Sequence, residues 1–401
     1  MSTQNYQYII IGGGLAGVSA IDGIREQDKT GLILLLSDEH QLPYDRPPLS
    51  KKLWLGKKKI EDIFLHNHQF YHENGVKLAL GSKAVSVDAT RKLVFDNKQN
   101  IYHYEKLLVA TGGSPRLLPI PGGNLEGLIY FRTLDDYLTL KKKAMEKASV
   151  LIIGGGFIGS ELAAALNINQ LDVTMIFPDA YLVSRVFPEA LGKALQIHYL
   201  EHKVKILNED KPVSISNLGD KYLTKTESGK QLITDVIIIG IGVIPEIGLA
   251  SDAGLHTVNG IIVNELLQTS NPDIYAAGDN ALFPYQALGQ PMRVEHWDNA
   301  LNQGKYAGRN MAGATEPYHY MPYFFSDLFD FGYEAVGEVN SALETFADWQ
   351  EINHTGVIYY LKDNKVRGVM LCNVWDKVEQ ARELIRKSEP VTLAQLVGLI
   401  R

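Results

Sequence analysis

The sequence predicts an α/β protein with two doubly wound β–α–β units and a small α+β domain at its C-terminal end. Two glycine-rich turns, about 140 residues apart, each follow a short apolar run and lead into a helical pattern. A second apolar run follows each helical pattern, and continuously apolar strands are typical of parallel sheets covered on both faces. From about Pro322 the pattern changes to short alternating segments, which indicate a separate α+β region.

The first unit is expected to comprise a strand at 8–11, a helix from 16 to about 27 and a second strand at 32–36. A GxGxxG motif separates the first strand from the helix, and two acidic residues follow the second strand. These residues are Gly12, Gly14 and Gly17 in the turn, and Asp38 and Glu39 after the strand.

The second unit repeats this order, with a strand at 150–153, a helix from 158 to about 167 and a strand at 173–177. Its motif residues and following acid are Gly154, Gly156, Gly159 and Asp179. The glycines of such a turn allow a tight bend, close approach of the backbone to a pyrophosphate, and helix–strand packing, while the acid accepts hydrogen bonds from a ribose.

Each feature taken singly is common, because glycine turns and solvated loop acids occur in many α/β proteins. Both motifs here follow an apolar strand, open a helix and precede an acid. Two complete units therefore predict two bound dinucleotides.

The remaining segments complete the expected order. A third strand-plus-glycine pattern carries Asp279, and the proline-rich segment 115–121 is typical of a linker. The other expected elements are a β meander at 85–87 and 92–95, strands at 107–110 and 236–239, a helix at 297–311, C-terminal strands at 335–339, 356–361 and 366–371, and a helix at 377–387.

Composition excludes several classes of protein. Lys plus Arg number 39 and Asp plus Glu 46, so the net charge of −7 does not favour nucleic-acid binding. The single cysteine, Cys372, excludes an intrachain disulfide, a CxxC dithiol and a cysteine-based structural zinc site. The apolar runs are far shorter than the ~20 residues of a membrane helix. With the first strand starting near Tyr8, we expect no presequence and a cytoplasmic protein.

Beyond the paired units, four stretches resemble the family of FAD-dependent pyridine nucleotide reductases. The segment 42–51 (LPYDRPPLSK) is similar to a loop of ferredoxin, rubredoxin and monodehydroascorbate reductases and of apoptosis-inducing factor. The segments 154–165 (GGGFIGSELAAA), 295–300 (EHWDNA) and 325–336 (FSDLFDFGYEAV) are most similar to apoptosis-inducing factor-like flavoproteins.

The resemblance implies a glutathione reductase-type fold and two cofactors, FAD and NADH. It implies a discontinuous FAD domain at 1–118 and 244–321, an NADH domain at 119–243 and a C-terminal α+β domain at 322–401. Positions matched to FAD contacts are Gly12, Gly14, Gly17, Asp38, Glu39, Arg46, Lys51, Val85, Arg132, Asp279, Glu295, His296 and Phe325. Positions matched to NADH contacts are Gly154, Gly156, Phe157, Ile158, Gly159, Glu161, Asp179, Arg185, Gly242, Glu334 and Asn373.

The matched catalytic residues are Lys51, Glu161 and His296. Lys51 and Glu161 resemble a Lys–Glu pair beside the flavin N5, and His296 begins a helix whose N-terminus stabilises negative charge on a reduced flavin. Each residue also has an ordinary interpretation: a solvated lysine, a first-turn acid of a helix, and a structural histidine.

The resemblance implies hydride transfer from NADH to flavin N5, then electron transfer to a small iron–sulfur protein or a quinone. Asp179 favours NADH because it would repel a 2′-phosphate, whereas the nearby Arg185 leaves NADPH open. The alternative function is a redox-sensing protein with slow NADH oxidation and NADH-dependent dimerisation, and both a monomer and a homodimer are possible.

Two departures from apoptosis-inducing factor bear on that alternative. Phe325 stands where that protein has a tryptophan against the nicotinamide, and only a short connection joins Ala347 to Gly356, where it carries a long insertion. We therefore do not expect the properties tied to that insertion.

Overall fold

The computed structural model describes residues 3–145 and 149–401. The chain forms two compact units, each assembled from separate stretches of sequence. Unit 1 comprises Met1–Asp45, Ile60–Ser114 and Pro245–Tyr323, whereas unit 2 comprises Arg46–Lys59, Pro115–Ile244 and Phe324–Arg401. Strands β7 (Gly113–Pro115) and β16 (Val243–Pro245) lie where the chain passes from one unit to the other.

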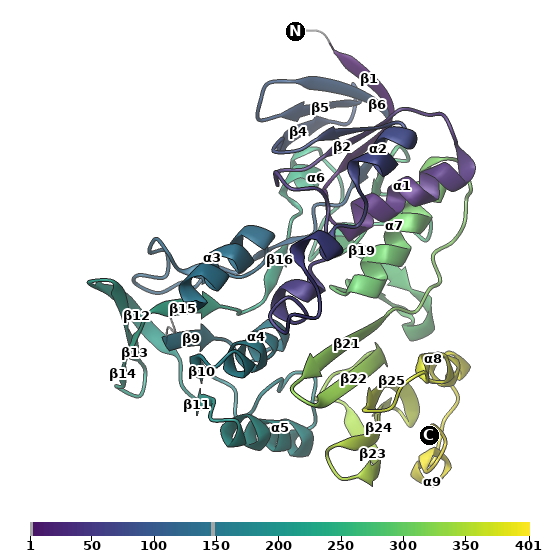
Figure 1. Cartoon of the computed structure of the whole chain (residues 1–401). Coiled ribbons are helices and arrows are strands. Elements are labelled where there is room, and N and C mark those ends of the chain that lie inside the picture. Colours follow the sequence, from purple (N-terminus) through teal and green to yellow (C-terminus); the bar gives the residue numbers. More distant parts are fainter. Residues whose placement is uncertain (1–2, 146–148) are drawn as a thin grey trace. The chain divides into compact units, whose positions relative to one another are not determined.

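Unit 1 is built around a mixed sheet (Figure 1), whose strand order is β3-β2-β1-β6-β5-β4. Strands β1, β2, β3 and β6 pair in parallel, β18 also pairs in parallel with β6, and β4, β5 and β6 pair antiparallel. Their bounds are β1 Gln4–Ile11, β2 Ile33–Leu36, β3 Val76–Ala79, β4 Ala84–Asp88, β5 Leu93–Asp96, β6 Ile101–Val109 and β18 Ile274–Ala276.

Helices α1 (Leu15–Gln27) and α7 (Trp297–Met311) of unit 1 lie side by side (Figure 1). A Cβ atom on Gly304 would lie 2.2 Å from the Ala16 carbonyl oxygen, and one on Gly308 would lie 2.1 Å from that of Ala20. The two backbones approach this closely because glycines of α7 face small residues of α1. The other elements of unit 1 are η2 Ile60–Ile63, α2 His68–Glu73, α6 Gly248–Asp252, β17 Ile261–Ile262, β19 Ala281–Tyr285, η3 Gln286–Leu288 and β20 Gln290–Met292.

Unit 2 contains a parallel sheet with the order β11-β10-β9-β15-β8. Buried apolar residues of this sheet pack against an antiparallel sheet of order β12-β13-β14. The bounds are β8 Ile129–Tyr130, α3 Leu134–Ala144, β9 Ser149–Ile153, α4 Phe157–Ile168, β10 Asp172–Ile176, α5 Glu189–Glu201, β11 Lys205–Leu207, β12 Pro212–Leu218, β13 Lys221–Thr226, β14 Gln231–Thr234 and β15 Val236–Ile239.

The C-terminal part of unit 2 is a sheet of order β21-β22-β25-β24-β23, on which α8 packs (Figure 1). The bounds are β21 Tyr323–Leu328, β22 Phe331–Gly337, β23 Glu344–Glu351, β24 Thr355–Lys362, β25 Lys365–Cys372, α8 Val378–Lys387 and α9 Leu393–Leu396.

The predicted β–α–β units are confirmed, with element ends within about two residues except at β1, which starts earlier. One expectation needs correction. The segment 115–121 is no loose linker, because Leu118 and Ile120 pack against the core of unit 2 and the Pro121 carbonyl accepts a hydrogen bond from the Ile215 amide at 2.9 Å. The connection between Ala347 and Gly356 is short, as expected, because β23 runs to Glu351 and β24 starts at Thr355.

Candidate functional site

The first glycine turn has the geometry that a pyrophosphate site requires. Gly12 has φ +122°, and a Cβ there would lie 2.1 Å from the Ala110 carbonyl oxygen. A Cβ on Gly17 would lie 2.1 Å from the Gly12 carbonyl oxygen, so the helix and strand meet at a glycine. Gly14, the N-cap of α1, faces open space with no atom within 4 Å of its Cβ position. This opening at the amino end of a helix fits a dinucleotide phosphate.

The second glycine turn, in unit 2, repeats these features. Gly154 has φ +125° and its Cβ would lie 2.3 Å from the Gly240 carbonyl oxygen, while a Cβ on Gly159 would lie 2.2 Å from the Gly154 carbonyl oxygen. Gly156, the N-cap of α4, again faces open space. Phe157 and Ile158 form the first turn of that helix. The residues around this turn therefore also fit a dinucleotide.

The acids after the second strands differ between the two units. Asp38 is exposed, whereas Glu39 is half-buried and accepts a hydrogen bond from the Tyr44 hydroxyl at 2.5 Å. In unit 2, the Asp179 side chain is exposed, and its backbone carbonyl accepts a hydrogen bond from the Glu209 amide at 3.1 Å. Both units thus present a carboxylate at the expected strand end.

Asp279 lies among buried polar groups of unit 1. The Gly278 amide donates to the Gln303 side-chain oxygen at 2.9 Å, and the Arg293 guanidinium donates to the Asp279 carbonyl at 2.9 Å. Asn280 donates to the Thr111 hydroxyl at 2.9 Å. Three buried atoms nearby have no hydrogen-bond partner within the described chain: Asn280 Oδ1, Gln303 Nε2 and Arg293 Nε. Such orphaned buried atoms fit a site completed by a polar ligand.

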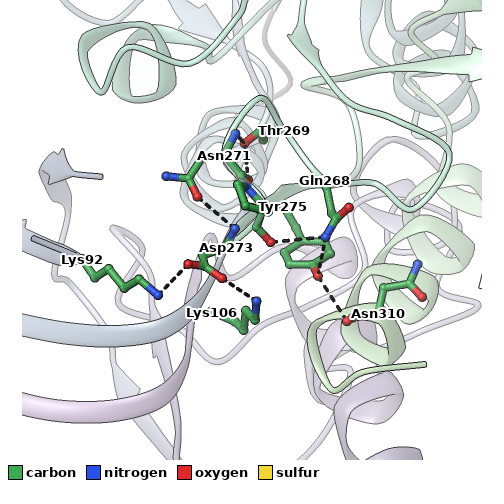
Figure 2. A network of polar contacts seen from close by, with 9 residues as sticks. Lys92, Lys106, Gln268, Thr269, Asn271, Asp273, Tyr275 and Asn310 are labelled. Atoms are coloured by element: carbon green, nitrogen blue, oxygen red, sulfur yellow. Dashed lines mark hydrogen bonds and ion pairs between the residues drawn. The ribbon is translucent and has the colours of Figure 1, made fainter. Parts of the chain in front are cut away.

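A polar network fixes the strand that leads to this site (Figure 2). The Asp273 carboxylate accepts from Lys92 and Lys106, each at 2.5 Å, and these hydrogen bonds hold the pKa of Asp273 below its usual value. Two residues further along, the Tyr275 hydroxyl donates to the Asn310 carbonyl on α7 at 3.2 Å. The network ties β18 to β6 and to α7, and so fixes where the third glycine pattern begins.

The amino end of α7 carries the predicted flavin-facing residues of unit 1. His296 is the N-cap and is half-buried; burial lowers its pKa to about 4, while the Asp279 charge opposes this shift. Its imidazole is therefore neutral at pH 7. Glu295, beside it, is exposed and pairs with Arg293. Elsewhere in unit 1, Val85 of β4, the position matched to an adenine contact, is exposed.

Lys51 and Glu161 form a buried ion pair inside unit 2. Their side chains are 2.9 Å apart (Nζ to Oε1), and the two residues are only 8% and 7% exposed. The interpretation of Lys51 as a solvated lysine is therefore wrong. The Lys51 ammonium also lies 4.8 Å from the centre of the Phe325 ring, within the range of a cation–π interaction.

Local packing explains why Lys51 points inward. It follows the 3₁₀ helix η1 (Pro47–Ser50), whose start is favoured by proline. A few residues later, the Trp54 indole donates to the Leu49 carbonyl at 2.9 Å, and the Trp54 carbonyl accepts from Asn169, the residue after α4. In the same unit, the Arg46 guanidinium donates to the Arg132 carbonyl at 2.8 Å.

Other predicted NADH positions are spread over unit 2. Gly242 has φ +100° and faces open space, and the exposed Arg185 is held through its carbonyl, which accepts from the Ser341 amide at 3.1 Å. Glu334 is half-buried, and burial raises its pKa. Asn373 has φ +47° and accepts from the Gly332 amide at 2.8 Å.

Several residues near these sites were not predicted: Ser50, Ser326, Asn280, Arg293 and Gln303. Ser50 and Ser326 lie inside motifs noted in the sequence, but their role depends on a tertiary contact with Glu161 that no local pattern reveals. Across residues 3–145 and 149–401, there is no cluster of His, Cys, Asp and Glu side chains suited to a metal ion. No helix in the same ranges has the length and apolar character needed to cross a membrane.

Comparison with known families agrees with this geometry. Residues 6–304 match the model described as pyridine nucleotide-disulphide oxidoreductase. The chain belongs to this family. Residues 307–355 and 347–387 match the C-terminal model of mitochondrion-associated apoptosis-inducing factor.

Individual relatives cover most of the chain. It is 34% identical to apoptosis-inducing factor 1 of Dictyostelium discoideum over 97% of this chain and 80% of that protein. It is 37% identical to a rubredoxin-NAD(+) reductase of Pseudomonas putida over 80% of this chain and 83% of that protein. The solved covalent complex of putidaredoxin reductase with putidaredoxin contains a chain that matches with a TM-score of 0.91 and 30% identity, over 98% of this chain and 96% of that chain.

The predicted resemblance is thus confirmed, and the chain is an FAD-dependent NADH oxidoreductase. It does not use a dithiol of its own, because Cys372 is its only cysteine. That thiol is fully buried, and burial raises its pKa.

Proposed function

We propose that this oxidoreductase passes electrons from NADH to a small iron–sulfur protein of the ferredoxin or rubredoxin type, with a quinone as a second possible acceptor. The proposal is supported by similarity to a rubredoxin reductase and to a putidaredoxin reductase solved with its partner. Bound FAD would supply the two-electron to one-electron conversion that such a transfer needs.

One observation carries the proposal: the buried ion pair joins Lys51, which follows η1, to Glu161 on helix α4, which begins at the second glycine turn. Gly156 caps the amino end of α4, and Glu161 lies within its first turns. In our proposal the turn holds the nucleotide phosphates, and Lys51 presents a fixed positive charge beside the reacting rings. The Phe325 ring shields that charge from water on one side.

We assign the main FAD contacts to unit 1. In unit 1, the first glycine turn would hold the pyrophosphate, Asp38 and Glu39 the ribose, Val85 the adenine, and the groups around Asp279 the pyrophosphate–ribityl region. For Arg46 and Arg132, an FAD contact remains a prediction from the resemblance. The amino end of α7, with Glu295 and a neutral His296, would stabilise negative charge on the flavin.

We assign NADH to unit 2, with Asp179 as the ribose acceptor. An exposed carboxylate at this strand end repels a 2′-phosphate, which favours NADH over NADPH. Gly242, Glu334 and Asn373 are assigned to the same nucleotide. The three-domain division remains a prediction.

Anaerobic titration tests the first half of the proposal. Addition of one equivalent of NADH to the purified holoprotein should bleach the flavin absorbance, and NADPH should do so much more slowly. Turnover is then measured with ferredoxins, rubredoxins and quinones as acceptors. Fast flavin reduction with no turnover on any iron–sulfur protein would contradict the proposed acceptor.

A second candidate is a redox-sensing protein that changes its oligomeric state when NADH binds. It is favoured by the 34% identity to an apoptosis-inducing factor over 97% of the chain. Gel filtration with and without NADH distinguishes the two candidates. Negligible turnover together with an NADH-dependent dimer supports the sensor, whereas fast turnover by an unchanged monomer or dimer supports the reductase.

We propose the cytoplasm as the compartment of this protein, which cell fractionation tests.

A further inference from the structure

The carboxylate of Glu161 is held by more than its lysine. The Ser50 hydroxyl donates to Oε2 at 2.5 Å, and the Ser326 hydroxyl donates to Oε1 at 2.5 Å. Lys51 Nζ contacts Oε1 at 2.9 Å. The donors come from η1 and β21, on either side of α4 in the sequence, so three elements meet at one side chain.

The burial of this cluster makes the hydroxyl donors necessary. Ser50 and Ser326 are each 2% exposed, so water does not replace them readily. A carboxylate removed from water is costly unless its oxygens accept hydrogen bonds. The 2.9 Å contact of the lysine is with Oε1, whereas Oε2 accepts from Ser50, so without Ser50 this second oxygen would lose that donor.

The two hydroxyls also fix the orientation of the carboxylate. A carboxylate that accepts hydrogen bonds at only one oxygen can rotate about its side-chain bonds. Hydrogen bonds to both oxygens fix the plane of the carboxylate. Since Lys51 Nζ is paired with that carboxylate, a set plane also sets the position of the ammonium over the Phe325 ring.

Two buried phenols near Glu161 add no competing charge. Burial together with the Glu161 charge raises the pKa of both Tyr199 and Tyr333, so both stay neutral. The Tyr199 hydroxyl donates to the Ser160 carbonyl at 2.8 Å rather than to the carboxylate.

We infer that Ser50 and Ser326 are positioning residues that orient the Glu161 carboxylate and, through it, hold the Lys51 ammonium where hydride transfer needs it. The inference rests on the proposed function of the Lys51–Glu161 pair. It assigns the serines no contact with NADH or the flavin.

A pair of variants with the same side-chain shape isolates the hydroxyl. Ser326→Thr keeps the donor, and Ser326→Val replaces it with a methyl group. In stopped-flow experiments at saturating NADH, Ser326→Val should reduce the flavin about ten-fold more slowly, the size expected for a lost hydrogen bond to a charged group. Ser326→Thr should remain near the wild-type rate, and the Kd for NADH should change little in either variant.

A second measurement does not depend on turnover. Labelling of Lys51 by acetic anhydride, followed by peptide mass spectrometry, reports how firmly the ammonium is held. The label should appear several-fold faster in Ser326→Val than in Ser326→Thr. Both measurements are repeated with Ser50→Ala, which removes the donor to the other oxygen, Oε2, in case Ser326→Val does not fold.

Ser228→Ala is the matched control, because Ser228 donates to the buried Asp210 carboxylate at the same 2.5 Å but in the β13–β14 turn. It should leave flavin reduction and Lys51 labelling unchanged. Equal rates and equal labelling in the Thr and Val variants would overturn the inference. Failure of wild-type protein to reduce its flavin with NADH would refute the proposed function instead, while the labelling comparison would still test the contact.

Discussion

The two glycine turns have nearly the same backbone but lead into very different helices. Gly12 and Gly154 differ by only 3° in φ, and Gly14 and Gly156 both face open space. Helix α1 of unit 1 then presents small residues to the glycines of α7, whereas α4 of unit 2 carries Glu161 on a buried face. The dinucleotide turn is thus a common scaffold, and the helix that follows it decides between close packing and a buried charge.

Replacing Lys51, the lysine of the buried ion pair with Glu161 of α4, should have the largest effect on the free energy of unfolding. Lys51→Met leaves the buried Glu161 carboxylate without its counter-ion, which should cost about 3–5 kcal/mol of unfolding free energy. Thermal or urea unfolding of the holoprotein measures this. The exposed pair Lys193–Glu189, at 2.6 Å, provides the control, because Lys193→Met should cost about 1 kcal/mol or less. Equal losses in the two variants would mean that the Lys51 pair is no more sensitive than a surface pair.

The two glycine turns could be predicted from the sequence, whereas the residues that hold the buried Lys51–Glu161 pair could not. A strand, a glycine turn and a helix are local features, so the positions of Gly12 and Gly154 followed from the pattern alone. The contacts of Ser50 and Ser326 with Glu161 join residues more than 100 positions apart, and no local period encodes them. Strand β23 was missed for a related reason, since its mixed burial lacks clean alternation.

The amino end of α7 should make stability depend on pH. The pKa of His296 is lowered to about 4 in the folded chain, from about 6.5 in the unfolded one. Between these values the unfolded chain binds the additional proton, so unfolding free energy should rise with pH and be lost on acidification, by about 3 kcal/mol at most. His296→Gln should flatten this part of the profile in urea unfolding from pH 4 to 7. A parallel profile in the variant would exclude His296 as the source.

A single added methyl group should disrupt the close packing of α1 against α7. Gly304→Ala would place a Cβ 2.2 Å from the Ala16 backbone, so α1 and α7 must separate, at a cost of about 1–3 kcal/mol. Gly248→Ala, in α6 of the same unit, faces open space and should be near neutral. The Gly304 variant should also lose FAD more readily, which the absorbance ratio of the purified protein measures. Unchanged stability and FAD content would show that α1 and α7 tolerate a wider spacing.

The smallest expected effect concerns the acids that follow the two turns. Asp179 is exposed, whereas Glu39 is half-buried and bonded by Tyr44, so Asp179 can be removed with little structural loss. Asp179→Ala should weaken NADH binding by about 1.5 kcal/mol, the value of a hydrogen bond to a charged group, and should weaken the preference over NADPH because a repulsive charge is gone. Titration of both nucleotides against flavin absorbance measures the two changes together. An NADH affinity that stays constant would remove Asp179 from the ribose, and the nucleotide preference would then have to come from another residue, with the exposed Arg185 as the first to test.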